Sequence, residues 1–381
     1  MPRLLALGCA LLLCGCTTLP GRDYPRQPSP LASAAPNPEL LQLQRGAPPA
    51  DAKAESAFRL YSLGIDGLLL RLELIDAAHS SLDLQYYIFH GDESGKLVTE
   101  ALLRAAARGV RVRILVDDGE TIRGDEQLFG LAGEQNVEIR VFNPWRYRGH
   151  NSFLRGTEYL FSHRRLDFRM HNKLLIADRA VALVGGRNVG DEYFQVDPNW
   201  QFADDDVLTT GPDVQQFAVS FEEYWQSELA IPVQALLPAK ATDAAAAAAL
   251  AQRVTVPKKA ASAGVDYEKK LSAREPLASV LTGRAPLDWA RAEVVVDSPY
   301  KGKEQVKNVP HISSLLFEPV AEAIHNTRSE LVIVSPYLVP SPQEMRLLEE
   351  LRAHGRNVRI LTSSLEAESS HAAQAGYMHY R

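Results

Sequence analysis

Two side chains that could act together on a phosphate stand two positions apart near the middle of the chain. His171 and Lys173 are followed by Asp178, Gly186 and Asn188 in the order H-x-K-x4-D-x6-G-G-x-N. Alternate residues of a β-strand project to the same face, so we expect the imidazole and the ammonium to reach one ligand. An imidazole is a competent nucleophile near neutral pH, and fixed ammonium and amide groups stabilise charge on phosphate oxygens. The set therefore favours phosphodiester cleavage by covalent catalysis.

A β-hairpin is expected to position these groups. The sequence is strand-like on both sides of Asp178 and Arg179, which predicts a turn between two strands, with the imidazole and the ammonium on the first. Because a carboxylate repels a phosphate, Asp178 is expected to fix the hairpin or to orient neighbouring donors. Gly186 follows the returning strand without a side chain, which would let a ligand approach the backbone closely.

Apolar periodicity predicts β-α-β units before the motif and again near the C-terminus. Elements are expected at 64–78, 81–89, 96–108 and 110–117, and again at 330–340, 344–353 and 358–362. AARGVRVRIL at 106–115 is similar to RAHGRNVRIL at 352–361, which indicates a duplicated domain. This order predicts an α/β fold with helices on both faces of a sheet.

The spaced set resembles the signature of the phospholipase D superfamily at every fixed position. LDLQYYIFHGDESGKLV, FADDDVLTTGP and FEEYW extend the similarity to the cardiolipin-synthase-type branch of bacterial phospholipase D-like proteins. The resemblance implies a phospholipase D-type sheet flanked by helices. It also implies that His171 is the nucleophile, that Lys173 and Asn188 bind the phosphate, with close approach at Gly186, and that Asp178 is the third catalytic motif member. Neither a metal nor another cofactor is expected.

Proteins of this type carry two such motifs, and both histidines act on one phosphate. The 56 residues that separate His171 from Leu115, applied to Leu361, put a second histidine at about residue 417, beyond Arg381. We therefore expect one complete domain plus an incomplete second copy, truncated before the second motif. An isolated chain is expected to be weak or inactive, since general acid catalysis contributes about 10²–10⁴-fold.

The N-terminus predicts export and lipidation. Arg3 precedes an apolar run at 4–13, which is too short to span a bilayer and fits a signal peptide. The run ends in Leu-Cys-Gly before Cys16, which resembles a lipobox, so Cys16 is the expected acylated residue. The three cysteines all lie in this segment, so no internal disulfide is expected. The predicted location is the bacterial cell envelope, with a lipid anchor on the periplasmic side of a membrane.

Composition, the internal repeat and the resemblance together divide the chain into five expected parts. These are a signal peptide at 1–15, a flexible tether at 16–55, a phospholipase D-like domain with the motif at 56–235, a low-complexity linker at 236–290 and a partial second domain at 291–381. The predicted function is phospholipid phosphodiester cleavage or phosphatidyl transfer, as in cardiolipin synthesis, with a phospholipid as the partner.

Two other functions stay open. One is a phospholipase D-type nuclease, although the net charge of −6 gives no support for nucleic-acid binding. The other is a non-catalytic envelope lipoprotein that acts as a scaffold. Among the basic residues, Arg111 and Arg113 are expected on an exposed strand face, and residues 163–165 in a solvated loop.

Further side chains near the motif have two interpretations. Tyr86 and Tyr87 could line a substrate cleft, but packing in the core of a strand is favoured. Asp204 and Asp206 could steer a polyol headgroup or cap a strand edge, and the sequence favours neither.

Overall fold

The computed structural model describes residues 35–44, 55–119, 130–148, 151–197, 201–236, 271, 273–301 and 316–364. The chain divides into two compact units, Met1–Val294 and Val295–Arg381, each of which is described here by itself. The predicted signal peptide, Cys16 and most of the predicted linker lie outside the described residues. Within the described part of the chain, none of the helices has both the length and the apolar character needed to cross a bilayer.

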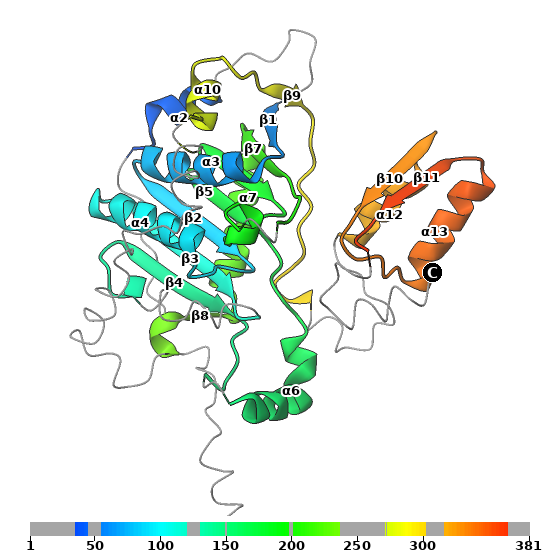
Figure 1. Cartoon of the computed structure of the whole chain (residues 1–381), viewed down its shortest axis with the longest axis horizontal. Coiled ribbons are helices and arrows are strands. Elements are labelled where there is room, and N and C mark those ends of the chain that lie inside the picture. Colours follow the sequence, from blue (N-terminus) through cyan, green and yellow to red (C-terminus); the bar gives the residue numbers. More distant parts are fainter. Residues whose placement is uncertain are drawn as a thin grey trace, which may run out of the picture. The chain divides into compact units, whose positions relative to one another are not determined.

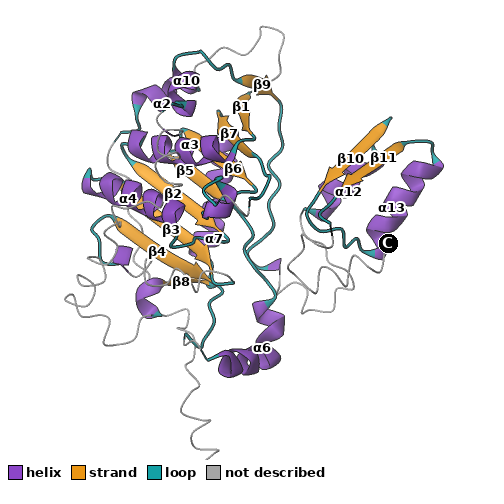
Figure 2. Ribbon diagram, in the orientation of Figure 1, coloured by secondary structure: helices purple, strands orange, loops and turns teal. Residues whose placement is uncertain are grey.

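In the described part of the first unit, nine strands form one mixed sheet (Figures 1 and 2). In spatial order they are β8 (Ala230–Pro232), β4 (Val137–Phe142), β3 (Arg111–Asp117), β2 (Ser81–Tyr86), β5 (Leu174–Ala177), β6 (Val181–Gly185), β7 (Asp206–Thr210), β1 (Ser56–Tyr61) and β9 (Asp288–Ala290). β2, β3 and β4 run parallel, as the predicted β-α-β unit requires. The other neighbours pair antiparallel, so β5 and β6 form the predicted hairpin beside β2.

Two helices, α3 (Gly64–Ala77) and α4 (Glu93–Ala107), lie side by side across one face of this sheet (Figure 1). α4 begins after Asp92, whose side chain accepts a hydrogen bond from the Gly95 N–H, as a helix N-cap does. It ends before Gly109, which has a φ of 91°. Its predicted apolar positions are all buried against the sheet: Val98, Ala101, Leu102, Ala105 and Ala106.

The other face of the sheet is covered by α7 (Asp213–Gln226). Side chains alternate across a strand, so Val112 and Ile114 join the core under α3 and α4, whereas Arg113 points the opposite way. There its guanidinium lies 4.8 Å from the ring centroid of Phe221 and 5.3 Å from that of Trp225, both in α7. The helices on both faces confirm the predicted α/β architecture.

Parts of the predicted tether and linker pack on the first unit, contrary to the sequence-based boundaries. α2 (Pro38–Leu43) lies within the predicted tether 16–55, and its Leu40 is fully buried in the core. α10 (Pro276–Leu281) and β9 lie within the predicted linker 236–290, yet β9 pairs with β1 and α10 buries Leu277. Three or four apolar residues suffice to hold each of these short elements against the first unit. So few residues do not change the composition of a segment enough to predict the element.

The described part of the second unit repeats the order seen in the first. α12 (Phe317–His325) is followed by β10 (Glu330–Val334), α13 (Pro342–Ala353) and β11 (Asn357–Leu361), and the two strands pair in parallel. α13 begins with a capping box between Ser341 and Glu344. This helix-strand-helix-strand order matches α3, β2, α4 and β3, in agreement with the internal repeat of the sequence.

Candidate active site

His171 and Lys173 lie directly ahead of β5 and not on it, which corrects the expectation that both stand on a strand. β5 begins at Leu174, whose backbone pairs with Gln85 of β2 on one side and with Val184 of β6 on the other. The two side chains therefore lie where β2 ends and the hairpin opens. They are held there by an ordered frame, because every residue of β5 is buried.

The structure brings the imidazole and the ammonium together. Nζ of Lys173 lies 3.0 Å from Nδ1 of His171 and donates a hydrogen bond of 2.7 Å to the carbonyl oxygen of the same residue. Tyr87 covers both groups, with its ring centroid 4.7 Å from that of His171 and 5.2 Å from the Lys173 Nζ. His171 is exposed whereas Lys173 is buried, so a ligand can reach the imidazole while the ammonium is shielded from water.

Burial changes the acidity of this lysine. Loss of solvent lowers the pKa of Lys173 to about 7, and the carboxylates of Asp204 and Asp117 counteract part of that effect. An ammonium that is poorly hydrated and near its titration point is well placed to gain from an incoming anion. Binding of a phosphate would restore its charge, since an opposite charge nearby favours the charged form.

Gly185 and Gly186 contact aspartates in this structure. A Cβ atom on Gly186 would overlap the carboxylate of Asp204, and one on Gly185 would overlap the backbone of Asp205. The N–H of Gly186 donates to the Asp205 carbonyl oxygen at 3.1 Å. The lack of side chains at the two glycines is therefore used for close contact with the segment before β7. A phosphate at Gly186, as the sequence predicts, would have to share this space with Asp204.

Asn188 joins the end of the hairpin to the end of β2. Its Oδ1 accepts a hydrogen bond from the Ile88 N–H at 3.0 Å, and its Nδ2 donates one of 2.8 Å to the hydroxyl of Tyr193. Tyr87, which packs on His171, is the residue before Ile88. The hydrogen bond to Ile88 therefore holds the Asn188 amide close to the candidate nucleophile. An amide nitrogen carries two hydrogens, which leaves capacity for a second acceptor such as a phosphate oxygen.

Asp178 is not brought to this site. It lies in the hairpin turn at the opposite end of β5. Five residues separate it from Lys173, which corresponds to about 16 Å along an extended segment that rises about 3.3 Å per residue. Its buried carboxylate accepts backbone N–H bonds of 2.7–3.0 Å from Asn37, His79, Ser80 and Ser81. This placement does not fit the catalytic role that the resemblance implied. It fits the alternative inferred from charge, that Asp178 fixes the hairpin.

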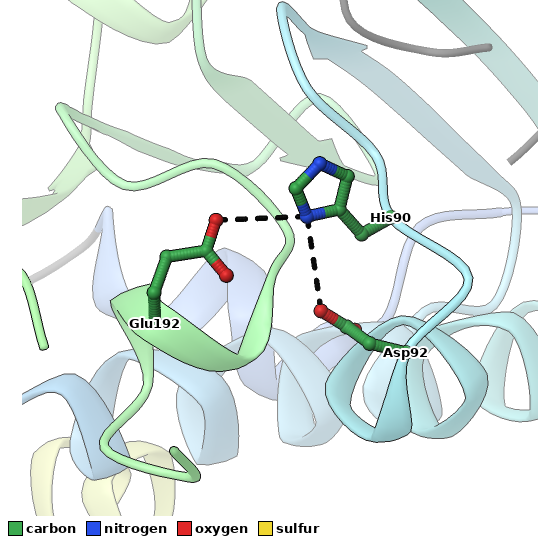
Figure 3. Close-up of side chains that lie close together, drawn as sticks. All are labelled: His90, Asp92 and Glu192. Carbon is green, nitrogen blue, oxygen red and sulfur yellow. Dashed lines mark ion pairs between the residues drawn. The ribbon is translucent and has the colours of Figure 1, made fainter. Parts of the chain in front are cut away.

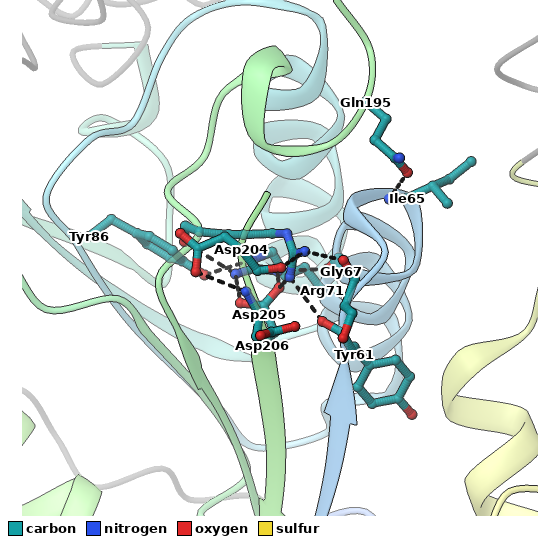
Figure 4. A network of polar contacts seen from close by, with 11 residues as sticks. Tyr61, Ile65, Gly67, Arg71, Tyr86, Gln195, Asp204, Asp205 and Asp206 are labelled. Atoms are coloured by element: carbon teal, nitrogen blue, oxygen red, sulfur yellow. Dashed lines mark hydrogen bonds and ion pairs between the residues drawn. The ribbon is translucent and has the colours of Figure 1, made fainter. Parts of the chain in front are cut away.

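A buried network of charges lies between the hairpin and α3 (Figure 4). Asp206 forms two hydrogen bonds of 2.8 Å with Arg71 and one of 3.2 Å with Arg187. Arg71 also donates to the hydroxyl of Tyr86 at 3.1 Å, which places Tyr86 in the core as the sequence favoured. Burial opposes the charge of Arg71, but Asp206 raises its pKa above the ordinary value. Asp206 therefore has a structural partner on each side and does not face a headgroup.

Asp117, at the carboxyl end of β3, holds the residues before His171. It accepts hydrogen bonds from the N–H of Met170 at 2.8 Å and from Nη1 of Arg169 at 3.0 Å. Burial raises the pKa of Asp117 to about 6, although Arg169 and the backbone donors favour the ionised form. The carboxylate thus fixes the approach to the site and contributes negative potential at Lys173.

A second polar cluster connects the loop after β2 with the short 3₁₀ helix η2 (Asp191–Tyr193). Figure 3 shows His90 between two carboxylates, with its Nδ1 3.5 Å from Oε1 of Glu192 and 3.8 Å from Oδ2 of Asp92. One ligand atom of each residue lies within 4.8 Å of the others, a spacing that could hold a cation. Burial alone would raise the pKa of Glu192, but the hydrogen bond with His90 lowers it. These contacts also explain the cluster as an ion pair that ties two loops together.

Sequence reasoning missed three residues around the motif pair. The sequence favours Tyr87 as a core residue, yet its ring covers His171 and Lys173. The sequence allows two interpretations of Asp204 and predicts Asp117 only as the end of a strand. Their common signal is position, because Tyr87 follows β2, Asp117 ends β3 and Asp204 precedes β7. Each therefore lies next to the end of a strand.

Comparison with known proteins identifies a matching family and several relatives. Residues 72–225 match the family described as cardiolipin synthase, PLD-like domain. Cardiolipin synthase C of Escherichia coli is 34% identical over 319 residues, which cover 83% of this chain and 64% of that protein. An uncharacterised protein of Helicobacter pylori is 32% identical over 332 residues, or 86% of this chain and 63% of that protein. The chain therefore spans slightly less than two thirds of the length of these relatives.

A solved structure shows the same fold. The phosphatidylserine synthase of Haemophilus influenzae aligns with 84% of this chain and 66% of its own, with a TM-score of 0.51 and 11% sequence identity. At that identity the likeness concerns the fold alone. It agrees with the mixed sheet flanked by helices in the first unit.

Proposed function

Because the chain belongs to the phospholipase D superfamily, in its cardiolipin-synthase type, we propose that His171 attacks the phosphodiester of a phospholipid. The observation that carries this proposal is the 3.0 Å contact between the imidazole of His171 and the ammonium of Lys173. A nucleophile and a cation that share one exposed position can engage a single phosphorus centre. The proposal includes Asn188 as a second donor and leaves Asp178 a structural role.

The first step transfers the phosphatidyl group to the histidine. An imidazole nitrogen forms a bond to phosphorus, the bond between phosphorus and one ester oxygen breaks, and the leaving alcohol takes up a proton from water. Negative charge builds on the two non-bridging oxygens, where Lys173 and the Asn188 amide stabilise it. Tyr87 packs against the ring of His171 and keeps it in position.

The second step decides between hydrolysis and transfer. An oxygen of water or of an acceptor alcohol attacks phosphorus, the bond from phosphorus to nitrogen breaks, and the attacking oxygen loses its proton. Attack by the headgroup hydroxyl of a second phospholipid gives a molecule of the cardiolipin type. We propose transfer as the finer activity, because one of the relatives is a cardiolipin synthase.

Protonation of the leaving alcohol is the demanding part of the reaction for this chain. The sequence contains one H-x-K-x4-D set, whereas proteins of this type use the histidine of a second set as the general acid. Lack of that group lowers a rate by about 10²–10⁴-fold. We therefore propose that the chain by itself forms the phosphohistidine more readily than it turns over.

The test separates these steps. Mixed vesicles that contain phospholipid labelled at the phosphorus are incubated with the purified chain, and the reaction is stopped in alkali, in which a phosphohistidine survives. Labelled protein that is lost in His171→Asn and retained in His354→Asn, an exposed histidine of the second unit, supports the proposal. Equal labelling of both variants, or none of the parent chain, contradicts it.

The same preparation tests the alternatives. Headgroup release and the formation of a diphosphatidyl product measure hydrolysis and transfer. Cleavage of DNA that is abolished by His171→Asn would favour the nuclease, and its dependence on salt would measure phosphate contacts. Absence of both covalent label and product would favour the non-catalytic scaffold.

We also propose that the chain is anchored in the bacterial envelope through an acylated Cys16 on the periplasmic side. The proposal rests on the resemblance of residues 13–16 to a lipobox. Labelled fatty acid should be incorporated by the parent chain and by Cys9→Ser but not by Cys16→Ser. Incorporation into Cys16→Ser would contradict the anchor.

A further inference from the structure

The helix just before the motif, α6 (Ser152–Leu166), is amphipathic, but its polar side faces inward and its apolar side is exposed. The side that packs against the rest of the first unit is largely polar. Arg165 donates to the Asn143 Oδ1 at 2.8 Å and contacts Glu158 at 3.1 Å, and Arg155 lies 4.7 Å from the ring centroid of Trp145. This face docks the helix through charges, aromatic contacts and one buried apolar residue, Leu166.

The opposite side of α6 is apolar and exposed. Phe153, Leu160 and Phe161 have 78%, 72% and 86% of their surface accessible. At about 100° per residue these three fall within one arc of the helix surface, and Leu154 extends that arc. Soluble proteins seldom expose large apolar side chains together without a partner for them. We call these four residues the apolar face of α6.

The charges on α6 define the partner. Arg164 falls within the same arc as the apolar face, and His163 lies beside it, whereas the one acidic residue of the helix, Glu158, is paired with Arg165 on the inner side. An apolar face with cations and aromatic rings at its border is typical of helices that lie in the interface of an anionic membrane. Two copies packed through this face would bring their Arg164 side chains together, which disfavours self-association.

The helix is joined to the site by a rigid connection. The carbonyl oxygens of Arg165 and Phe168 both accept hydrogen bonds from the Asn143 side chain, at 2.7 and 2.8 Å. Arg169 donates to the Asn143 carbonyl oxygen at 2.9 Å and to Asp117. Figure 1 shows α6 extending away from the sheet at the end of this segment. Only four residues separate the helix from His171.

We propose that the apolar face of α6 inserts into the interfacial layer of a bilayer that contains anionic phospholipids. The side chains of Phe153, Leu160 and Phe161 enter the acyl boundary, and Arg164 contacts headgroup phosphates. The helix thereby keeps the motif close to the lipid surface. The inference rests on the proposed function for its purpose, but the contact with lipid can be measured without any chemistry at His171.

A tryptophan at the tip of the face reports its depth. In the full chain, Phe161→Trp is compared with Val219→Trp, which places the same reporter at an exposed position of α7. Vesicles of phosphatidylglycerol and phosphatidylethanolamine carry bromine on their acyl chains, and the signal of the parent chain is subtracted. We expect quenching of the residue 161 reporter to exceed that of the residue 219 reporter by about twofold or more. Equal quenching would overturn the proposal.

Substitutions on the apolar face test its contribution to binding. Phe153→Ser, Leu160→Ser and Phe161→Ser together should lower the fraction that floats with vesicles by roughly tenfold if α6 is a principal contact. Val219→Ser is the matched control for loss of an exposed apolar side chain. If an acyl anchor holds the chain on vesicles despite these substitutions, the difference in quenching between the two tryptophan reporters still tests whether α6 inserts. Reporter fluorescence that depends on protein concentration but not on lipid would identify a second copy as the occupant and overturn the proposal.

The two proposals fail in different ways. His171→Asn should abolish the covalent label and leave the quenching of the residue 161 reporter unchanged. A chain that is quenched but never labelled refutes the proposed chemistry alone. A chain that is labelled but shows no difference between the two reporters refutes the role of α6 alone.

Discussion

Nζ of Lys173 lies 3.0 Å from Nδ1 of His171, and the same ammonium donates to the carbonyl oxygen of that histidine at 2.7 Å. The lysine therefore contacts the group that we propose as the nucleophile. When a phosphate enters, Nζ must exchange the imidazole contact for a phosphate oxygen, which leaves the imidazole accessible to phosphorus. The protonation state of Lys173 should then control how tightly an anion binds.

Anion affinity should fall as the pH rises through about 7. Burial lowers the pKa of Lys173 to about 7, and a bound anion raises it again, so binding takes up a proton above that pH. The affinity is highest below the pKa that Lys173 has in the ligand-free protein. Above that pKa it decreases by at most about tenfold per pH unit. A short-chain phosphodiester, whose own charge is constant over this range, can be titrated calorimetrically from pH 6 to 9.

Lys173→Arg tests whether this pH dependence belongs to the lysine. A guanidinium stays charged over the whole range, so the variant should keep its anion affinity above pH 7 even if its geometry weakens binding at pH 6. A parent chain whose affinity is flat between pH 7 and 9 would show that Lys173 stays charged without ligand.

Asp204→Asn should move this pH dependence toward acid. The carboxylate beside Gly186 raises the pKa of Lys173, so its removal leaves burial less opposed and lowers that pKa further. Affinity should then be lost below pH 7, even though removal of a nearby negative charge favours anions at lower pH. Asp205→Asn, at an exposed neighbouring position, is the matched control. A shift of the midpoint toward alkaline pH in Asp204→Asn would refute this electrostatic role.

Asp178→Asn should reduce stability and leave the chemistry intact. Its carboxylate accepts N–H bonds from Asn37 and from residues 79–81, and an amide would turn a donor toward some of them. We expect a loss of about 2–4 kcal/mol in the free energy of unfolding, measured with urea. Asp76→Asn, which removes an exposed ion pair with Arg104, should cost less than about 1 kcal/mol.

The covalent label provides the second readout for Asp178→Asn. Under conditions where the variant is folded, the phosphohistidine should form at a rate close to that of the parent chain. Loss of labelling with an unchanged unfolding midpoint would return Asp178 to the catalytic group.

The sequence predicted the site where short-range spacing determines geometry. His171 and Lys173 were expected to act together, and their contact follows from a separation of two residues in an extended segment. The hairpin turn was also predicted from local residue types, and φ is positive there at both Asp178 and Arg179, 53° and 54°. The charge argument predicts that Asp178 fixes the hairpin, and its hydrogen bonds with backbone N–H groups fit that role. Motif resemblance alone groups it with the catalytic residues.

Contacts between distant segments could not be predicted in the same way. Residues 163–165 are predicted to lie in a solvated loop, but they belong to the last turn of α6. The prediction failed because Arg165 docks on Asn143 through a hydrogen bond, and such a contact leaves no periodic pattern of apolar residues. Asp117 and Tyr87 reach the site only after β2, β3 and β5 are placed side by side in the sheet. Strand order depends on packing of helices far along the chain, and one sequence does not specify it locally.

The predicted exposure of Arg113 is the clearest error of the sequence analysis, and the observed contacts of this residue lead to a further prediction. Alternation of Val and Arg placed it on an exposed strand face, yet α7 covers that face and the side chain is almost fully buried. Nε and Nη2 bond to Asp83 at 2.6 and 2.9 Å, and Nη1 bonds to Glu222 at 2.8 Å. Burial disfavours the guanidinium, but these carboxylates outweigh it and raise the pKa of Arg113.

Arg113→Met should therefore destabilise the first unit by about 3–5 kcal/mol, because it leaves Asp83 buried with only a 3.4 Å contact to Arg111. Arg113→Met combined with Asp83→Leu should recover much of that loss, since the unpaired charge is then absent as well. Urea unfolding of the two variants gives both values, with Arg104→Met as the exposed control. If the double variant is less stable than the single one, the carboxylate is not the source of the penalty, and packing of the arginine against Phe221 and Trp225 must supply the stability instead.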